Sequence, residues 1–188
     1  MTDSAPRAED RVTEPTRIVL IGPPGAGKST VGEALARRLG QPFVDLDREI
    51  EQREGRRIGE IFARSGEPYF RRLEREVSEE LGRGPGSAVV ATGGGWVTNE
   101  GVVALLRKGG RIMYLEASPE RALARLEGAA GTRPLLAGPD PIAALRMLLQ
   151  ARRPLYEAAA DVVIPTDLLT VQEVTDRIVE LVSSSGGR

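Results

Sequence analysis

Short apolar runs alternate with longer amphipathic stretches along most of the chain. Five runs rich in apolar and β-branched residues predict strands, at 18–21, 43–45, 88–91, 111–115 and 161–165. Apolar residues at helical spacing predict helices at about 28–39, 47–54, 58–64, 67–81 and 99–108, from 118 onward, and at 142–160 and 171–182. This alternation predicts the α/β class, a five-stranded parallel sheet with helices on both faces. Ligands of such folds bind at the carboxyl ends of the strands.

Single residues mark several of the predicted helix ends. Gly40 is expected to end the first helix, and Gly55 and Gly66 are expected to break the following ones. Asn99 has the side chain of an N-cap for the helix that begins there. Pro154 should bend or interrupt the helix that contains it, because proline has no N–H to donate.

Three segments show neither helical nor strand periodicity. Residues 1–16 are polar and predict a disordered N-terminal tail, and residues 183–188 predict a flexible C-terminal tail. The stretch 127–139 is rich in glycine, alanine and proline, which is typical of a mobile surface segment. A single domain at 17–182 is therefore expected between the two tails.

Composition narrows the chemistry and the partners. The 188 residues include 26 basic and 27 acidic side chains, so their balance indicates neither nucleic acid nor a membrane surface as a partner. The chain has no long apolar segment and no signal peptide, which favours the cytoplasm. It also has no cysteine and no histidine, which excludes thiol nucleophiles, imidazole bases and the usual zinc sites. Carboxylates, Lys, Arg and Mg²⁺ remain, an inventory that suits direct phosphoryl transfer.

The strongest motif is Gly22-Pro-Pro-Gly-Ala-Gly-Lys-Ser-Thr30, which follows a predicted strand and opens a predicted helix. It fits the phosphate-binding loop pattern, in which glycines let backbone N–H groups turn toward phosphates. The helix start and the Lys28 cation attract the anion, and the Ser29 hydroxyl can bind Mg²⁺. The predicted nucleotide-binding residues are Gly25, Ala26, Gly27, Lys28, Ser29 and Thr30.

Two carboxylates, Asp45 and Asp47, follow the second predicted strand. Period-2 alternation would place both on one side of the strand. A second interpretation is that Asp47 caps the helix that follows. The residues alone leave both open.

Further motifs follow in a fixed order behind the loop: Asp45-Leu-Asp47, Phe70-Arg71, Gly93-Gly94-Gly95, Arg133-Pro-Leu-Leu136 and Arg152-Arg-Pro-Leu-Tyr156. Taken together over residues 17–182, they resemble the motif set of shikimate kinases, P-loop enzymes of the nucleoside monophosphate kinase fold. The resemblance implies ATP-dependent phosphorylation of the 3-hydroxyl of shikimate, with Mg²⁺, in aromatic amino-acid biosynthesis. A monomer is expected.

The resemblance also implies roles for single residues. Asp47 would act as the base or orienting group for the substrate hydroxyl, and Asp45 would hold the Mg²⁺ shell through water, beside Ser29. Arg71 and Arg152 would pair with the shikimate carboxylate. Gly93, Gly94 and Gly95 would contact the substrate ring, Phe62 and Phe70 would form walls of the same pocket, and Glu74 would orient Arg71. Arg125 would contact adenine. The segment 127–139 would close as a lid that carries the catalytic Arg133.

Simpler interpretations accompany these roles. Arg71 lies in a charged run that is typical of a solvated helix face, and the glycine triplet could be a plain tight turn. Arg133 could be an exposed loop charge, and Arg153 could replace Arg152. At the level of the whole chain, the alternatives are another small-molecule P-loop kinase, such as a gluconate or nucleoside monophosphate kinase, or a non-catalytic nucleotide-binding regulator.

Overall fold

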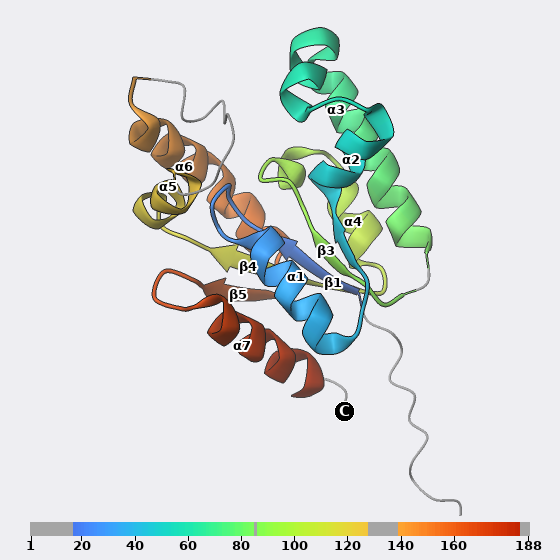
Figure 1. The fold of residues 1–188 in the computed structure, drawn as a ribbon, viewed down its shortest axis with the longest axis vertical. Coiled ribbons are helices and arrows are strands. Elements are labelled where there is room, and N and C mark those ends of the chain that lie inside the picture. The colour runs from blue at the N-terminus through green and yellow to red at the C-terminus, as the bar shows by residue number, and fades with distance from the viewer. Residues whose placement is uncertain (1–16, 85, 128–138, 185–188) are drawn as a thin grey trace, which may run out of the picture.

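Five parallel strands form a single sheet in the order β2-β3-β1-β4-β5 in the computed structural model, which describes residues 17–84, 86–127 and 139–184 (Figure 1). The strands are β1 (Arg17–Ile21), β2 (Phe43–Asp45), β3 (Val89–Ala91), β4 (Gly110–Glu116) and β5 (Val162–Pro165). Every neighbouring pair runs parallel. The prediction of a five-stranded parallel sheet is confirmed.

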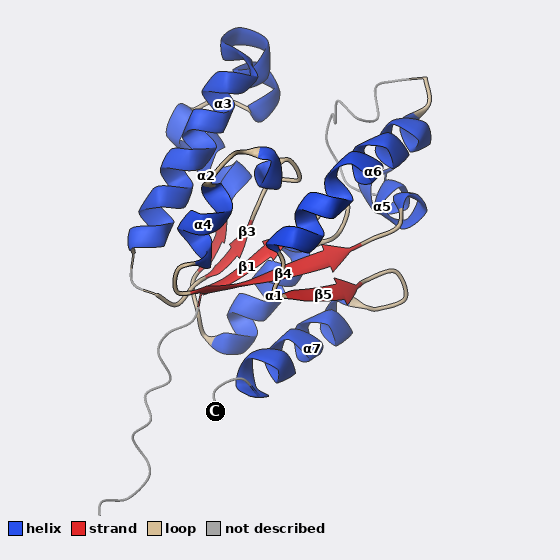
Figure 2. Cartoon of the chain, turned by 180° about the vertical axis from the view of Figure 1, so that it is seen from behind, coloured by secondary structure: helices blue, strands red, loops and turns tan. Residues whose placement is uncertain are grey.

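Helices cover both faces of this sheet (Figure 2). They are α1 (Lys28–Leu39), α2 (Leu46–Glu54), α3 (Ile58–Arg83), α4 (Val102–Arg107), α5 (Pro119–Glu127), α6 (Pro141–Ala159) and α7 (Val171–Ser183), with a 3₁₀ turn, η1, at Trp96–Thr98. Alternate residues of β1 enter two cores. Ile18 and Leu20 pack with α1 and α7, whereas Val19 and Ile21 pack with α3, α4 and the C-terminal end of α6.

The predicted break at Gly66 is confirmed, and the prediction at Asn99 needs correction. Gly66, with φ 78°, interrupts the helical geometry of α3, so the predicted helices at 58–64 and 67–81 are its two parts. The helix expected from Asn99 begins at Val102, because Gly101 with φ 78° is its N-cap and Trp96–Thr98 form a separate turn. Asn99 is therefore not an N-cap.

Pro154 does not interrupt its helix. It lies inside α6, which runs from Pro141 to Ala159. Proline removes one backbone hydrogen bond, but Leu149 and Tyr156 are buried against the sheet on either side of it. Packing of these two side chains holds both halves of the helix in place, so the missing bond does not end it.

Most residues of the predicted tails and mobile segment lie outside the described residues, namely 1–16, 128–138 and 185–188. The described flanks are the last turn of α5, which ends at Glu127, and the end of α7 at Ser183. Within the described ranges, no helix combines the length and apolar character needed to cross a membrane.

Candidate active site

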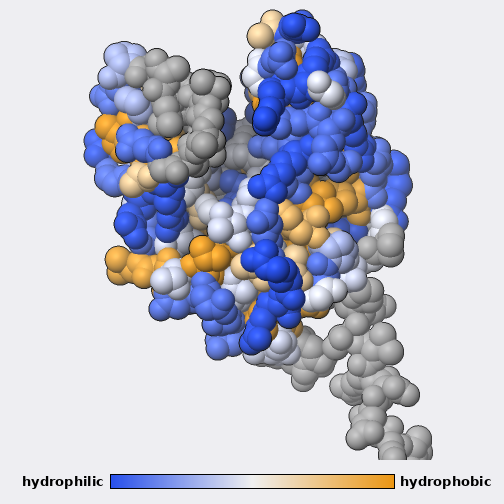
Figure 3. Space-filling view, viewed as in Figure 1, coloured by the Kyte–Doolittle hydropathy of each residue, from blue (hydrophilic) through white to orange (hydrophobic). Residues whose placement is uncertain are grey.

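The predicted functional residues within the described ranges meet at one edge of the sheet. The loop 22–27 follows β1, Asp45 ends β2, and Gly93 lies just beyond β3. Since β2, β3 and β1 are adjacent and parallel, their carboxyl ends open onto the same region. In the space-filling view the surface is hollowed between the side that carries α3 and the side that carries α5 and α6 (Figure 3).

The loop after β1 has the backbone that phosphate binding requires. Gly22, Gly25 and Gly27 all have positive φ, at 144°, 80° and 90°. A Cβ at Gly25 would also clash with the Ala122 carbonyl oxygen of α5. Helix α1 begins directly after Gly27 without a side-chain cap and without an acidic residue in its first turn. Its N–H groups and the positive end of its dipole therefore remain available to an anion.

Lys28 places its cation inside this loop. The residue is 8% exposed, and its Nζ donates hydrogen bonds to the carbonyl oxygens of Gly22 at 2.8 Å and Pro23 at 2.9 Å. Although Pro23 has no N–H to offer, its carbonyl helps to hold the ammonium. The loop thus presents a positive charge at its centre.

Asp45 is the cap of α2. Its Oδ1 accepts hydrogen bonds from the backbone N–H groups of Asp47 at 3.1 Å and Arg48 at 3.2 Å. Its Oδ2 accepts a hydrogen bond from the Ser29 hydroxyl at 2.5 Å. Asp45 is extended, with φ −100° and ψ 115°, which aims its carboxylate at the first turn. The alternative in which Asp47 caps the helix is therefore wrong.

Asp47 instead has a buried carboxylate oxygen that lacks a hydrogen-bond partner among the described residues, Oδ1. Burial raises the pKa of this carboxyl to about 6, with a further increase from the charge of Asp45. Lys28 acts in the opposite direction, and Glu74 and Glu51 contribute smaller increases. A desolvated carboxyl with a raised pKa and an open acceptor atom is suited to accept a proton.

The glycine triplet lies against side chains from three helices. A Cβ at Gly93 would lie 2.7 Å from Oδ1 of Asp47, and one at Gly95 would lie 2.5 Å from Nη2 of Arg71. The Gly94 carbonyl accepts a hydrogen bond from Nη1 of Arg152 at 3.1 Å. None of the three glycines has a positive φ. Glycine is therefore required here because side chains of other elements approach the backbone closely, and not because of the backbone angles. The interpretation as a plain tight turn does not account for these contacts.

Arg71 is set into this site by its neighbours. Its side chain is 18% exposed, compared with 61% for Arg72, so it does not belong to a solvated helix face. It donates to Oε2 of Glu74 at 2.9 Å and to Oε1 of Glu67 at 2.9 Å. The Glu74 side chain is fully buried, and burial raises its pKa while the Arg71 charge opposes that rise. Glu74 therefore orients Arg71 as a buried partner.

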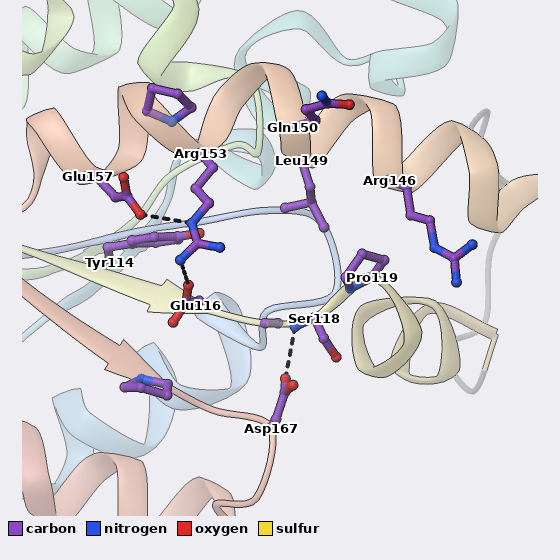
Figure 4. Close-up of a pocket in the computed structure, with 13 residues that line it drawn as sticks. Tyr114, Glu116, Ser118, Pro119, Arg146, Leu149, Gln150, Arg153, Glu157 and Asp167 are labelled. Carbon is purple, nitrogen blue, oxygen red and sulfur yellow. Dashed lines mark hydrogen bonds and ion pairs between the residues drawn. The ribbon is translucent and has the colours of Figure 1, made fainter.

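Arg152 and Arg153 point to different places. Arg152 contacts the glycine triplet. Arg153 pairs with Glu116 at 3.0 Å and Glu157 at 2.8 Å in a groove along α6, beside the ends of β4 and β5 (Figure 4). The geometry favours Arg152 as the arginine of this site.

Comparisons with known proteins identify the family of this chain. The model of the family described as shikimate kinase matches residues 24–183. The chain belongs to the shikimate kinase family. A shikimate kinase from Symbiobacterium thermophilum is 46% identical over 172 residues, which cover 91% of this chain and 98% of that protein. The solved shikimate kinase from Acinetobacter baumannii in complex with shikimate has a TM-score of 0.84 at 37% identity, covering 93% of this chain and 96% of that one.

A gluconokinase from Sinorhizobium meliloti matches more weakly. Its TM-score is 0.54 at 20% identity, covering 92% of this chain and 98% of that chain. This likeness extends to the fold alone.

Two residues of this shikimate kinase family member contribute to the site in ways that sequence reasoning did not find. The Tyr156 hydroxyl donates to the Gly94 carbonyl, and its ring stacks on Tyr114 with centroids 5.0 Å apart. Asn99, expected as a helix cap, donates from its amide to Arg71 and Glu74. The only signal for Tyr156 was its place in the last motif.

The predicted aromatic walls differ from each other in exposure. Phe70 is 4% exposed and belongs to the core on the α3 side of the sheet, whereas Phe62 is 37% exposed. The rings are 4.8 Å apart, and the Arg71 guanidinium lies 5.5 Å from the centre of the Phe70 ring. Phe70 is thus a core residue that also supports Arg71.

Arg125 connects the phosphate-binding loop to the segment after β5. Its guanidinium donates to the Thr166 carbonyl at 2.7 Å and approaches the Gly25 carbonyl at 3.5 Å. This places it beside the phosphate loop, where its predicted contact with adenine can be tested. Arg133 lies outside the described residues, as does nearly all of the predicted lid at 127–139, so the catalytic role of Arg133 stays a prediction.

Proposed function

We propose that the chain transfers the terminal phosphoryl group of ATP to the 3-hydroxyl of shikimate, giving shikimate 3-phosphate and ADP, a step in aromatic amino-acid biosynthesis. Membership of the shikimate kinase family supports this reaction. The observation that carries it is the convergence of Asp47, Arg71 and Arg152 on one glycine triplet next to the phosphate-binding loop. In this proposal a proton acceptor, two cations that bind the substrate carboxylate and a phosphate cradle would lie side by side.

The nucleotide phosphates would bind to the loop 22–27 and the first turn of α1. Gly25, Ala26 and Gly27 would supply backbone N–H groups, and Lys28 would exchange its loop carbonyls for phosphate oxygens. Thr30 would complete the contact from the first turn of the helix. The uncapped start of α1 supports this position.

The residues beside the loop fit Mg²⁺. Among the described residues, no group of three or more histidine, cysteine or acidic side chains could enclose a metal ion. Mg²⁺ bound to nucleotides commonly takes one or two protein oxygens and completes its shell with phosphates and water. Ser29 would be a direct ligand and Asp45 would hold the water shell, since their oxygens lie 2.5 Å apart. When bound, the ion would neutralise charge on the phosphates.

Asp47 would handle the proton. As the substrate oxygen bonds to the γ-phosphorus and the bond to the β-phosphate oxygen breaks, the hydroxyl proton would pass to the carboxylate of Asp47. Its raised pKa brings the group closer to the pH at which it works, and Oδ1 has no competing donor among the described residues. The charge that develops on ADP would stay with the loop and Lys28.

Arg71 and Arg152 would bind the carboxylate of shikimate. Arg71 uses three of its five N–H donors on Glu67 and Glu74 within the described residues, which leaves donors for a ligand. Arg152 approaches from α6 on the other side of the triplet. Two guanidinium groups on a partly desolvated carboxylate would select an acid over a neutral polyol such as glucose.

A coupled ADP-release assay with shikimate, gluconate, AMP and CMP as separate acceptors tests this function. We expect turnover with shikimate and at most background release with the other three. Phosphorus NMR of the product should show one new phosphate ester, on the 3-hydroxyl. ADP release with gluconate or a nucleotide, and none with shikimate, would overturn the proposal, and binding of ATP without any acceptor-dependent release would favour the regulator instead.

We further propose that the enzyme acts as a monomer in the cytoplasm, without nucleic acid or a membrane as partner. The near balance of 26 basic and 27 acidic residues supports the part of this proposal that concerns nucleic acid and membranes. Light scattering at assay concentrations tests the oligomeric state.

A further inference from the structure

Asn99 occupies an unexpected position at the edge of the site. Its amide Nδ2 donates to the backbone carbonyl of Arg71 at 2.8 Å and to Oε2 of Glu74 at 3.2 Å. Arg71 donates from Nη1 to the same Oε2 at 2.9 Å. One amide group therefore contacts both members of the ion pair that positions the arginine.

The chain holds Asn99 firmly in this place. Gly95 is the N-cap of the turn η1, and Trp96, the first residue of the turn, is fully buried. The Trp96 indole donates to the Ser78 hydroxyl at 3.1 Å, and that hydroxyl donates to the Glu74 carbonyl at 2.7 Å. The backbone N–H of Asn99 donates to the Trp96 carbonyl at 3.0 Å. The segment 96–99, which follows the glycine triplet, is thus bonded to α3 at both ends, through Trp96 and through Asn99.

We propose that Asn99 is a positioning residue that sets the affinity for shikimate, because it fixes the carboxylate of Glu74 and through it the guanidinium of Arg71. This inference rests on the proposed function. It adds a residue that acts through others and does not touch the substrate.

The electrostatic surroundings explain why a donor is needed. Glu74 is fully buried, and burial raises its pKa. The groups that favour its charged form are Arg71 on its own helix, the Asn99 amide after η1 and Arg152 from α6, and Asp47 of α2 is the nearby like charge. Its other oxygen, Oε1, has no hydrogen-bond partner among the described residues. Among the described residues, loss of the amide would leave Arg71 as the one hydrogen-bond donor to this carboxylate.

The test compares Asn99→Asp and Asn99→Ala with the wild-type enzyme. Asn99→Asp is nearly isosteric but places a second carboxylate beside Glu74, and Asn99→Ala removes the donor without adding charge. We expect the KM for shikimate to rise at least about tenfold in both, since a hydrogen bond to a charged group is lost. The KM for ATP should stay within about twofold, because the loop at 22–27 is untouched.

The pH dependence separates positioning from a general loss of stability. In Asn99→Asp two neighbouring carboxyl groups share one site, so one of them should gain a proton and become a donor as the pH falls. The ratio of its shikimate KM to the wild-type value should therefore shrink between pH 8 and pH 6. A fold that is merely loosened would raise both KM values and would not recover in this way.

Gln172→Glu is the matched control. Gln172 donates from its amide to Oδ1 of Asp176 at 2.9 Å on the exposed face of α7. Gln172→Glu replaces this amide-to-carboxylate hydrogen bond by repulsion between two carboxylates, away from the site. Its two KM values should equal those of the wild type. Wild-type shikimate KM in both Asn99 variants, in an enzyme that does phosphorylate shikimate, would overturn this inference alone. Wild-type protein without activity on shikimate would overturn the proposed function.

Discussion

Replacement of Asp47 by asparagine should make the protein more stable and much less active. The side chains have nearly the same shape, but asparagine has no charge to desolvate. In the native protein, Oδ1 of Asp47 is buried without a hydrogen-bond partner among the described residues, and the neighbouring Asp45 repels its negative charge. The charged carboxylate of Asp47 therefore lowers the stability of the folded protein, which is common for residues at functional sites.

The size of the effect follows from linkage. The pKa of Asp47 rises from 3.8 to about 6 on folding. Between these values the folded protein holds a proton that the unfolded chain has released, so stability decreases as the pH rises through this window and stays lower above it. A shift of about two units corresponds to about 3 kcal/mol at most. Because the residue is partly exposed, we expect Asp47→Asn to gain about 1 to 3 kcal/mol at pH 7.

Thermal unfolding without nucleotide or divalent cation measures this gain. We expect the Tm at pH 7 to rise by about 2 to 10 °C. At pH 4 wild-type Asp47 is protonated in the folded state, so the difference in Tm should largely disappear. Turnover with shikimate should fall by roughly 10²-fold or more, because the amide cannot accept the hydroxyl proton.

Asp45→Asn is the matched control for this prediction. An asparagine at this position can still accept the two backbone N–H groups, but it removes the negative charge favoured at a helix start and the acceptor for Ser29, so we expect stability to fall by about 0.3 to 1 kcal/mol. The two substitutions, two residues apart, should therefore change the stability in opposite directions. The reasoning is refuted if Asp47→Asn is less stable than the wild type at pH 7, or if its gain is equal at pH 4 and pH 7.

The remaining predictions concern the cations and the triplet. Lys28→Ala should abolish phosphoryl transfer, with a wild-type circular dichroism spectrum, and retained turnover would contradict the assignment of the loop. Arg152→Ala should weaken shikimate binding by about 2 to 4 kcal/mol, whereas Arg153→Ala should change it little, and titration calorimetry would show the reverse order if the assignment is wrong. Gly95→Ala should push the Arg71 guanidinium aside and raise the KM for shikimate about tenfold without affecting ATP, and steady-state kinetics with an unchanged KM would argue against close approach as the reason for glycine.

The sheet and the phosphate-binding loop could be predicted from the sequence because their signals are local. A buried parallel strand is a short apolar run, as at Ile18–Ile21, and the alternation of strands and helices predicts that the strands run parallel. The order of the strands was not predicted, since β1 lies between β3 and β4 and not beside β2. The loop combines glycine spacing, Lys28 and a helix start within nine residues. Each of these features depends on neighbours along the chain, so no tertiary contact had to be known.

Tertiary contacts decide whether Asn99 caps a helix, which was predicted wrongly, and whether Asp47 does, which the sequence left open. Asn99 and Asp47 both have side chains that cap helices, and the sequence cannot show that Gly101 and Asp45 take these positions instead. Pro154 stays within α6 because side chains on both sides of it are buried. In each case local preference competes with packing, and packing decides.

The substrate side of the site shows why sequence spacing alone could not assemble it. Asp47 comes from α2, Arg71 from α3 and Arg152 from α6, and no periodicity relates helices that distant in the chain. What brings them together is a stretch of backbone without side chains, since Gly93, Gly94 and Gly95 each face a different partner. A methyl group at Gly93 or Gly95 would displace a functional group and leave the fold intact. Substitutions there should therefore lower the affinity for shikimate more than they lower stability. If the triplet were only a structural turn, the loss of stability would be the larger effect.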